Sequence, residues 1–266
     1  MTDNIRIEKQ RNREAEGRAA SLPAGAAASI AMLLLILVML LSSFQLVIYG
    51  DQQYRFYERE YRKYNVMDSL DMEIEDVMEV TDYMMDYLIG REEELSIVTE
   101  VEGRRQDFFN EQDRLHRADV RNLFLGGLKL RNMCAVIAVL LTAGLILGKE
   151  DWKRVLPRAY TRAVVVLLAV IVFLAIAFTI DFTRCFTIFH QIFFTNDLWM
   201  FNPSEDYMIR MLPEGFFSDM VIRIGAVFIG MMLLVWVIFK MLSRFRLCNR
   251  KTSQPYKQKI FRKEWK

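Results

Sequence analysis

The sequence contains little histidine, cysteine and proline, and each scarcity excludes a class of protein. Of its 266 residues, two are histidine, three are cysteine and five are proline. Three cysteines are too few for a small domain built on disulfides, and they do not form the paired C-x-x-C spacing of a zinc site. Five prolines and 12 glycines exclude collagen-like chains, and a hydrophobic fraction of 53% excludes a disordered one. The sequence therefore predicts a folded chain with a large apolar content.

Acidic and basic residues are also missing from four long stretches, although 26% of the chain is charged. These apolar runs cover residues 23–50, 133–148, 163–180 and 224–239. About 20 apolar residues, at ~1.5 Å per residue, cross a ~30 Å hydrocarbon core. The third run has no polar face, which a long core helix of a soluble protein would need. We therefore predict four transmembrane helices, of which the first is a retained signal anchor.

The charges outside these runs are sorted by sign. Segments 1–22, 149–162 and the tail from Lys240 together hold 20 basic and 7 acidic residues. Segments 51–132 and 183–219 hold 25 acidic and 14 basic residues. By the positive-inside rule, both termini are expected in the cytoplasm. The basic tail is attributed to this topology and to attraction for anionic lipid heads, in preference to nucleic-acid binding.

The expected fold is an all-α membrane protein with four transmembrane helices. A mainly helical extracytoplasmic domain with a short β-hairpin and an interfacial aromatic loop complete it. The expected segments are a cytoplasmic N-terminal tail (1–22), transmembrane helix 1 (23–50), the extracytoplasmic domain (51–131), transmembrane helix 2 (132–148), a cytoplasmic loop (149–162), transmembrane helix 3 (163–182), the extracytoplasmic aromatic loop (183–219), transmembrane helix 4 (220–240) and a basic cytoplasmic tail (241–266).

The extracytoplasmic domain shows three local patterns. From Val66 to Leu88, apolar residues recur three or four positions apart with acidic residues between them, which predicts an amphipathic helix that ends at Gly90. The β-rich flanks of Gly103 predict a short hairpin within residues 95–109. From Glu111 onward the pattern is helical again, and this helix is expected to run on into the second span.

His116 and His190 both fall in segments expected outside the cell. Histidine has an ordinary pKa of ~6.5, so it takes up and returns protons at neutral pH. Two histidines at the level of lipid ester groups suit acyl transfer, in which one deprotonates an amine or hydroxyl and the other steadies an oxyanion. The same pair could instead bind a metal with Asp or Glu, but no H-E-x-x-H spacing favours a metal site. Asp119, three residues after His116, is placed to accept a ring N–H and fix the tautomer.

The aromatic loop supplies further candidates. Asn202, followed by proline at N1 and Glu205 at N3, predicts a short helix through Met211. Asn196 and Asp197 are typical of a turn, and Glu214 of a helix cap. The residues predicted to support the reaction or bind its substrate are Asp119, Asn196, Asp197, Trp199, Asp206 and Glu214.

Two charges and two thiols lie near the outer ends of the spans. Charges within a membrane are functional candidates by default, and the simplest interpretation of Asp181 and Arg223 is that they pair with each other. A disulfide between Cys134 and Cys185 is compatible with the topology.

Three short motifs resemble those of one known family. They are FHQIFFTNDLW at 189–199, NPSED at 202–206 followed by MLPEGFF at 211–217, and the upstream HRADV at 116–120. They look like a family of four-span bacterial integral membrane proteins whose characterised branch is the lipoprotein intramolecular transacylase. The resemblance covers roughly residues 25–240.

The resemblance implies an acyltransferase of the bacterial cell membrane. Such an enzyme moves an acyl chain of a lipid-modified N-terminal cysteine onto the α-amino group of that cysteine, which makes a lyso-form lipoprotein. His116 and His190 would be its catalytic pair, and it would need no cofactor and no metal. Its expected partners are the lipoprotein N-terminus and membrane lipid, and no nucleic acid.

Two other functions remain open from the residues alone. One is a non-enzymatic sensor or complex subunit whose acidic external domain binds a ligand. A sensor should couple to a cytoplasmic output module, and the short basic tail contains none. The other is a metal-dependent membrane hydrolase, which metal in the purified protein would support.

Overall fold

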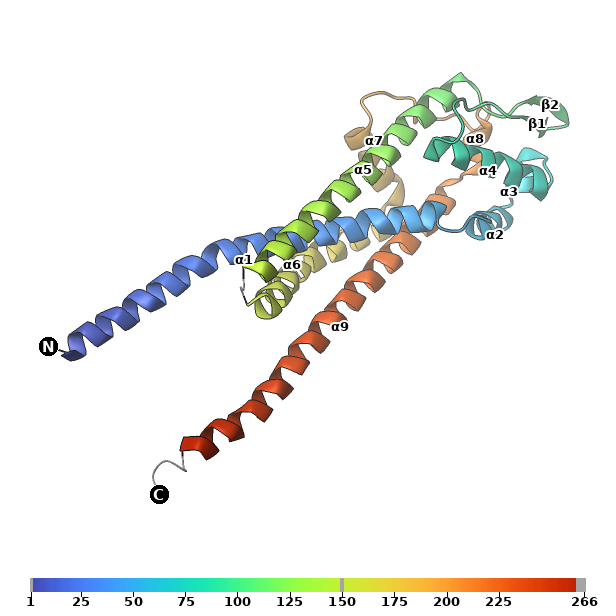
Figure 1. The fold of residues 1–266 in the computed structure, drawn as a ribbon. Helices are drawn as coiled ribbons and strands as arrows, with labels where there is room; N and C mark the ends of the chain where they lie inside the picture. The colour runs from blue at the N-terminus through green and yellow to red at the C-terminus, as the bar shows by residue number, and fades with distance from the viewer. Residues whose placement is uncertain (1, 149–150, 262–266) are drawn as a thin grey trace. The chain divides into compact units, whose positions relative to one another are not determined.

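The computed structural model describes residues 2–148 and 151–261, with side chains for 23–148 and 151–242. Four helices are long: α1 (Thr2–Tyr49), α5 (Glu111–Leu147), α6 (Trp152–Ile180) and α9 (Glu214–Phe261). The shorter elements are α2 (Arg55–Lys63), α3 (Val66–Leu70), α4 (Ile74–Ile89), β1 (Val98–Val101), β2 (Arg104–Asp107), α7 (Phe182–Phe193) and α8 (Tyr207–Met211). Figure 1 shows their order along the chain. The side chains of the predicted tail 1–22, and nearly all of those in 241–266, lie outside the described residues.

Each long helix contains a segment that is apolar and long enough to cross a membrane. These segments are Pro23–Tyr49, Glu111–Leu147, Trp152–Ile180 and Glu214–Leu242. In the most apolar 18-residue window of each segment, between 0% and 33% of the window is buried inside the protein. The remaining apolar side chains therefore need a lipid environment. The all-α class and the four predicted spans are confirmed, and the chain is a multi-pass membrane protein.

The chain divides into two compact units. Unit 1 comprises Met1–Met39, Met133–Val170 and Ile229–Lys266, and unit 2 comprises Leu40–Asn132 and Ile171–Phe228. In unit 1, the buried Tyr160 of α6 donates its hydroxyl to the carbonyl oxygen of Met232 in α9 at 2.7 Å. The ring of Tyr160 also meets that of Phe239 edge-on, with 5.4 Å between centroids. These contacts fix α6 against α9.

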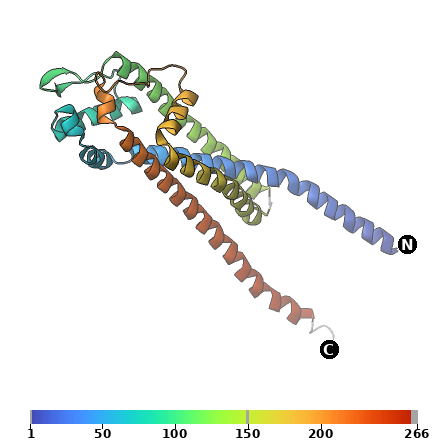
Figure 2. The same cartoon turned by 180° about the vertical axis from the view of Figure 1, so that it is seen from behind.

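Unit 2 contains an aromatic core that holds its short elements together. Phe216, at the start of α9, lies 5.2 Å from the ring of Tyr57 and 6.0 Å from that of Tyr61, both in α2. The buried hydroxyl of Tyr61 is hydrogen-bonded to Thr81 of α4 at 2.8 Å. Burying a large ring of this kind stabilises a fold by about 1.5–3 kcal/mol. Figures 1 and 2 show α2, α3, α4, α8 and the hairpin gathered in one region of this unit.

The amphipathic helix predicted up to Gly90 is broken in two. Asp71 adopts the left-handed conformation with φ of 49° and ends α3, and α4 begins at Ile74. Aspartate tolerates this conformation better than most side chains. The apolar spacing continues across the break, so the spacing does not reveal where α3 ends. The predicted end is confirmed, since Gly90 caps α4 with φ of 84°.

The hairpin predicted within residues 95–109 is confirmed. β1 and β2 pair antiparallel, with Val98 opposite Asp107. Glu102 and Gly103 connect them with φ of 53° and 67°. Two positive φ values in a two-residue connection are the geometry that matches the twist of the flanking strands.

The two other helical predictions around the spans had different outcomes. α5 runs without a break from Glu111 through the second span, as expected. The segment 183–219, in contrast, is not mainly a loop. Phe182–Phe193 form α7, and the carboxylate of Asp181 caps it by accepting the N–H of Arg184 at 2.9 Å.

The short helix expected to open at Asn202 begins later. The Asn202 side chain accepts the N–H of Ser204 at 3.1 Å, which makes a turn instead of a helix cap. α8 therefore begins at Tyr207 and ends at Met211, and only its end was predicted correctly.

Candidate active site

The two histidines meet in unit 2. His116 lies in the second turn of α5, and His190 lies in the last turn of α7. Their ring centroids are 6.0 Å apart and their planes differ by 29°, so the rings are stacked. His116 is 6% exposed and His190 is 7% exposed. His190 is the one residue of α7 that is buried. The pair that the sequence placed on one side of the membrane is therefore also a pair in space.

Aromatic rings enclose the histidine pair. Phe194 and Phe201 lie 5.2 Å and 5.3 Å from His116, measured between ring centroids. Around His190, four ring centroids lie between 4.1 and 5.6 Å away, those of Phe186, Phe189, Phe194 and Trp199. Such surroundings keep water away and lower the local dielectric, which strengthens any polar interaction made inside them.

One tautomer of His190 is fixed by its own helix. Its Nδ1 lies 2.8 Å from the carbonyl oxygen of Phe186, one turn earlier. A carbonyl oxygen only accepts hydrogen bonds, so Nδ1 carries the proton. In the neutral ring, Nε2 then holds the lone pair. His190 is thus oriented with one nitrogen occupied and the other available as a base.

The protonation of His190 is also set by its surroundings. Burial lowers the pKa of His190 below its ordinary value of 6.5, and the hydrogen bond to Phe186 opposes this change in part. The neutral, basic form is therefore the resting form at neutral pH. On the facing ring, Nδ1 of His116 is buried without a hydrogen-bond partner among the described residues. Such an atom at a candidate site is one that a bound ligand can satisfy.

Asp119 does not fix the tautomer of His116, which was its predicted role. Its carboxylate accepts a hydrogen bond from the Asn196 side chain at 2.8 Å. Asn196 belongs to the loop after α7, and its side-chain oxygen accepts the N–H of Leu198 at 3.2 Å. The turn predicted at this position is thus tied to α5 by a charge-assisted hydrogen bond.

Trp199 joins this loop to the pair of histidines. Its indole N–H donates to the carbonyl oxygen of Asn196 at 2.9 Å, and its ring lies 4.9 Å from that of His190. Gln112, which the sequence did not single out, donates to the carbonyl oxygens of Leu198 and Met200 at 3.1 Å each. The sequence could have indicated Gln112, because it lies four residues before His116 and residues four apart share a helix face.

Asp206 holds the start of α5 from another segment. It is 3% exposed, and its carboxylate accepts the Asn110 side-chain amide at 2.5 Å and the backbone N–H of Asn202 at 2.6 Å. Asn110 in turn exchanges hydrogen bonds with Asp113, at 3.0 and 2.9 Å, in the reciprocal geometry of a capping box. Asp206 thus positions the helix end that carries His116, instead of reaching the rings itself.

Among the contacts of the described residues, the two remaining candidates make none with the histidine rings. Glu214 accepts a hydrogen bond from the Thr183 hydroxyl at 2.7 Å, which links the start of α9 to α7. Asp197 is exposed and accepts the N–H of Met200 through its backbone carbonyl at 3.0 Å. Both contacts are structural.

The ion pair expected between Asp181 and Arg223 is not among those formed by the described residues. The Asp181 carboxylate instead caps α7. The guanidinium of Arg223 lies over the ring of Phe56, 4.6 Å from its centroid. A cation over an aromatic face is stabilised by the ring quadrupole, which gives Arg223 a partner of another kind.

Cys134 and Cys185 are both free, so the disulfide left open by the topology is not formed. Among the residues that the structure describes, no group of three or more His, Cys, Asp or Glu side chains is arranged to hold a metal ion.

The fold and the site define an integral membrane protein with four spans and an enclosed pair of histidines suited to proton transfer. A family model described as "Lipoprotein intramolecular transacylase Lit" matches residues 29–217, which include both histidines. Since this match covers more than half of the chain, the chain belongs to the lipoprotein intramolecular transacylase family, and it is a membrane enzyme. Among curated protein sequences, none matches it closely enough to count as a relative.

Solved structures support the fold. The chain is similar to the membrane integral lipoprotein intramolecular transacylase Lit from Bacillus cereus, with 21% identity and a TM-score of 0.68 over 85% of this chain and 98% of that one. Two variants of that protein, with one histidine replaced by arginine or by alanine, are also similar. Both have 20% identity, with TM-scores of 0.65 over 91% of this chain and 99% of the variant, and 0.64 over 89% and 99%. Of the three functions left open by the sequence, the family match supports the transacylase.

Proposed function

We propose that this enzyme moves an acyl chain from the diacylglyceryl group of a lipoprotein's N-terminal cysteine to the α-amino group of the same cysteine. The product is a lyso-form lipoprotein with an N-acyl chain. The observation that carries this proposal is the stacked, enclosed pair formed by His116 and His190, inside the range matched by the family model. The charge sorting in the sequence supports an orientation with both termini in the cytoplasm and the pair at the outer face of a bacterial cell membrane.

In the proposed reaction, Nε2 of His190 is the general base. The α-amino nitrogen attacks the ester carbonyl carbon, so a C–N bond forms while the nitrogen loses a proton to Nε2. The tetrahedral intermediate then collapses, the C–O bond to glycerol breaks, and the glyceryl oxygen takes the proton from Nε2. One ester becomes one amide, and no further reactant enters.

His116 takes the second role in this proposal. A ring N–H of His116 donates a hydrogen bond to the oxyanion that develops on the carbonyl oxygen. Its nearness to His190 supports this role, and so does its buried Nδ1, which has no hydrogen-bond partner in the part of the chain that the structure describes. The aromatic rings around the pair exclude water, which would otherwise hydrolyse the ester.

The test uses the full-length protein in vesicles with a synthetic lipopeptide that carries a diacylglyceryl cysteine and a free amine. The vesicle phospholipids carry deuterated acyl chains. We expect a product of unchanged mass whose fragment ions place one unlabelled acyl chain on nitrogen. Deuterium in the product would show that phospholipid is the donor, and absence of N-acylation would contradict the proposal.

Asn196→Ala is expected to lower the turnover rate about tenfold or more. The lost hydrogen bond to Asp119 is charge-assisted, and such bonds contribute about 1.5–3 kcal/mol. The measurement is the initial rate of lyso-lipopeptide formation at saturating substrate. If the contact between Asn196 and Asp119 is responsible, Asp119→Ala and the double variant Asn196→Ala/Asp119→Ala should be no slower than Asn196→Ala. Asp197→Ala, the exposed neighbour, is the matched control and should keep the wild-type rate.

The state of His190 can be measured directly, because the chain has only two histidines. Its pKa is lowered by burial, so its ring should remain neutral as the pH falls through 6.5 and become protonated only in more acidic solution. An unfolded chain would bind that proton more readily, so acidification below pH 6.5 also favours unfolding through this group. The check is an NMR titration of ¹³C-labelled histidine in the full-length protein, with resonances assigned from a His116→Gln sample. A His190 resonance that titrates above pH 6.5 would contradict this assignment.

A further inference from the structure

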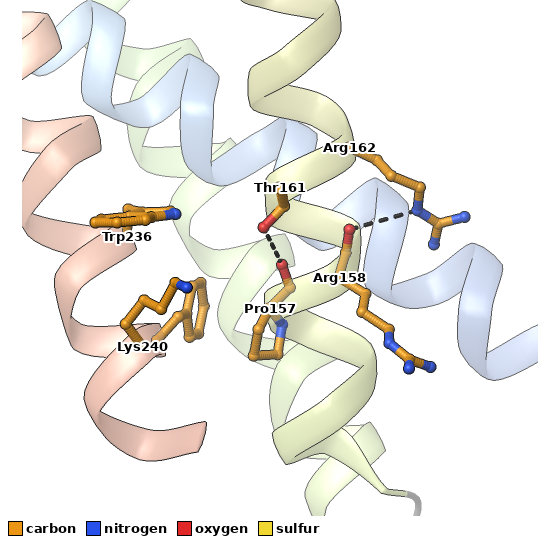
Figure 3. A pocket seen from close by; sticks show the side chains of 7 residues that line it. Pro157, Arg158, Thr161, Arg162, Trp236 and Lys240 are labelled. Carbon is orange, nitrogen blue, oxygen red and sulfur yellow. Dashed lines mark hydrogen bonds between the residues drawn. The ribbon is translucent and has the colours of Figure 1, made fainter. Parts of the chain in front are cut away.

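A cavity of about 620 Å³ lies between α6 and α9 within unit 1. Residues between 157 and 162 of α6 and between 236 and 240 of α9 line it. In Figure 3, Trp236 and Lys240 of α9 lie across from Pro157 and Thr161 of α6. The reaction proposed above uses none of these residues.

The walls of this cavity are held by buried contacts. The Tyr160 hydroxyl is bound to the Met232 carbonyl oxygen at 2.7 Å, and Phe239, a lining residue, packs against the Tyr160 ring. The Thr161 hydroxyl donates to the Pro157 carbonyl oxygen at 2.8 Å, so its polar group is satisfied within α6. The space between the helices is therefore framed by fixed backbone.

The charged residues that line the cavity are all basic. They are Arg158, Arg162 and Lys240, and the other lining residues are aromatic or uncharged. Lys240 extends from α9 toward α6, with its Nζ 5.3 Å from the centroid of the Trp236 ring. Both arginines line the cavity, but their side chains extend from the side of α6 away from α9 (Figure 3). Lys240 is therefore the basic side chain that points into the space between the helices, while Arg162 Nε donates to the Arg158 carbonyl oxygen of its own helix at 3.4 Å. Basic side chains that can reach one point select an anion, above all a phosphate.

The position of the cavity along the spans specifies the source of that phosphate. Arg162 directly precedes the apolar run 163–180, Arg158 lies one helical turn earlier, and Lys240 directly follows the run 224–239. The cavity thus lies where two spans leave the hydrocarbon, at the depth of lipid headgroups. Basic pockets between transmembrane helices at this depth bind the heads of acidic lipids.

Apolar stripes continue from the cavity along both helices. Val165 stands one turn beyond Thr161 on α6, and Leu233 stands about one turn before Trp236 on α9. Their side chains are 64% and 58% exposed. A lipid whose phosphate lies in the cavity would place its acyl chains along these stripes.

We propose that this cavity is a binding site for an anionic phospholipid, with its phosphate held by Lys240, Arg158 and Arg162 and its acyl chains along the α6 and α9 stripes. The two arginine side chains are exposed and turn toward the phosphate when the lipid binds. Trp236 borders the headgroup, as interfacial tryptophans do. The site is separate in the sequence from the histidine motifs and does not depend on the proposed reaction.

The test is native mass spectrometry of the full-length, detergent-purified protein titrated with phosphatidylglycerol or with phosphatidylcholine of the same acyl chains. We expect phosphatidylglycerol to bind about tenfold more tightly than phosphatidylcholine, since each basic residue near a lipid surface contributes severalfold. The double variant Arg158→Gln/Arg162→Gln and the single variant Lys240→Gln should each lose most of this preference. The control is Lys153→Gln/Arg154→Gln, which removes the same charge from the same helix outside the cavity.

Each outcome decides the proposal. Equal binding of the two lipids would overturn it, and so would an equal loss in the control variant, because only diffuse surface charge would then attract the lipid. Glycerol phosphate is added as a competitor for phosphatidylglycerol. Failure to displace the lipid supports a lipid site, and displacement at comparable concentration would show a site for soluble phosphate instead. Unchanged formation of lyso-lipopeptide by the variants shows that they are folded.

Discussion

His190→Ala is expected to lower lyso-lipopeptide formation by about 10²- to 10⁴-fold, the range that a positioned general base contributes. The reason is the fixed tautomer: with Nδ1 bound to the Phe186 carbonyl oxygen, Nε2 is the nitrogen free to take the proton of the attacking amine. Without it, the attacking amine loses the one base whose orientation is fixed by a hydrogen bond. The measurement is the single-turnover rate with the diacylglyceryl lipopeptide, which reports the chemical step without product release.

Two further variants separate loss of the base from loss of structure. His190→Gln fills similar space but offers no basic nitrogen, so it should be as inactive as His190→Ala. Ile192→Ala lies two residues on in the same helix, where the side chain is 71% exposed, and should keep a near-wild-type rate. A rate within tenfold of wild type for His190→Gln would remove His190 from the role of base.

Patterns within single helices were the part of the fold that the sequence could predict. Four uncharged runs were enough to locate the spans, because hydrocarbon excludes charge along the whole length of a helix. The hairpin followed from Gly103 between β-rich flanks, which matches the positive φ found there. The break at Asp71 was missed, since apolar spacing persists across it and one left-handed residue leaves no mark in the periodicity.

The candidate site was predictable in its residues but not in its contacts. The sequence placed His116 and His190 on one side of the membrane, yet their stacking arises from tertiary contacts between α5, α7 and the loop after α7. Spacing alone suggested that Asp119 serves His116. Its partner is instead Asn196, 77 residues away, and local spacing carries no information on such a contact.

His116→Ala is expected to lower the same rate by about 10²- to 10³-fold, the cost of losing one donor to a developing oxyanion. His116 faces His190 at 6.0 Å between ring centroids. His190 can therefore reach the attacking amine nitrogen while His116 reaches the carbonyl oxygen of the same ester. Because a donor can be replaced where a base cannot, His116→Gln should recover part of the loss through its amide N–H. Leu115→Ala, a 47% exposed neighbour in α5, should behave as wild type.

The glutamine variants therefore assign the roles. If His116 is the donor and His190 the base, glutamine restores activity at position 116 and not at position 190. The opposite pattern would exchange the two roles, and recovery at both positions would mean that neither histidine transfers a proton. The double variant His116→Ala/His190→Ala should be hardly slower than His190→Ala, because groups that act together in one transition state lose their effect together. Fully additive losses would show that the two rings act in separate steps.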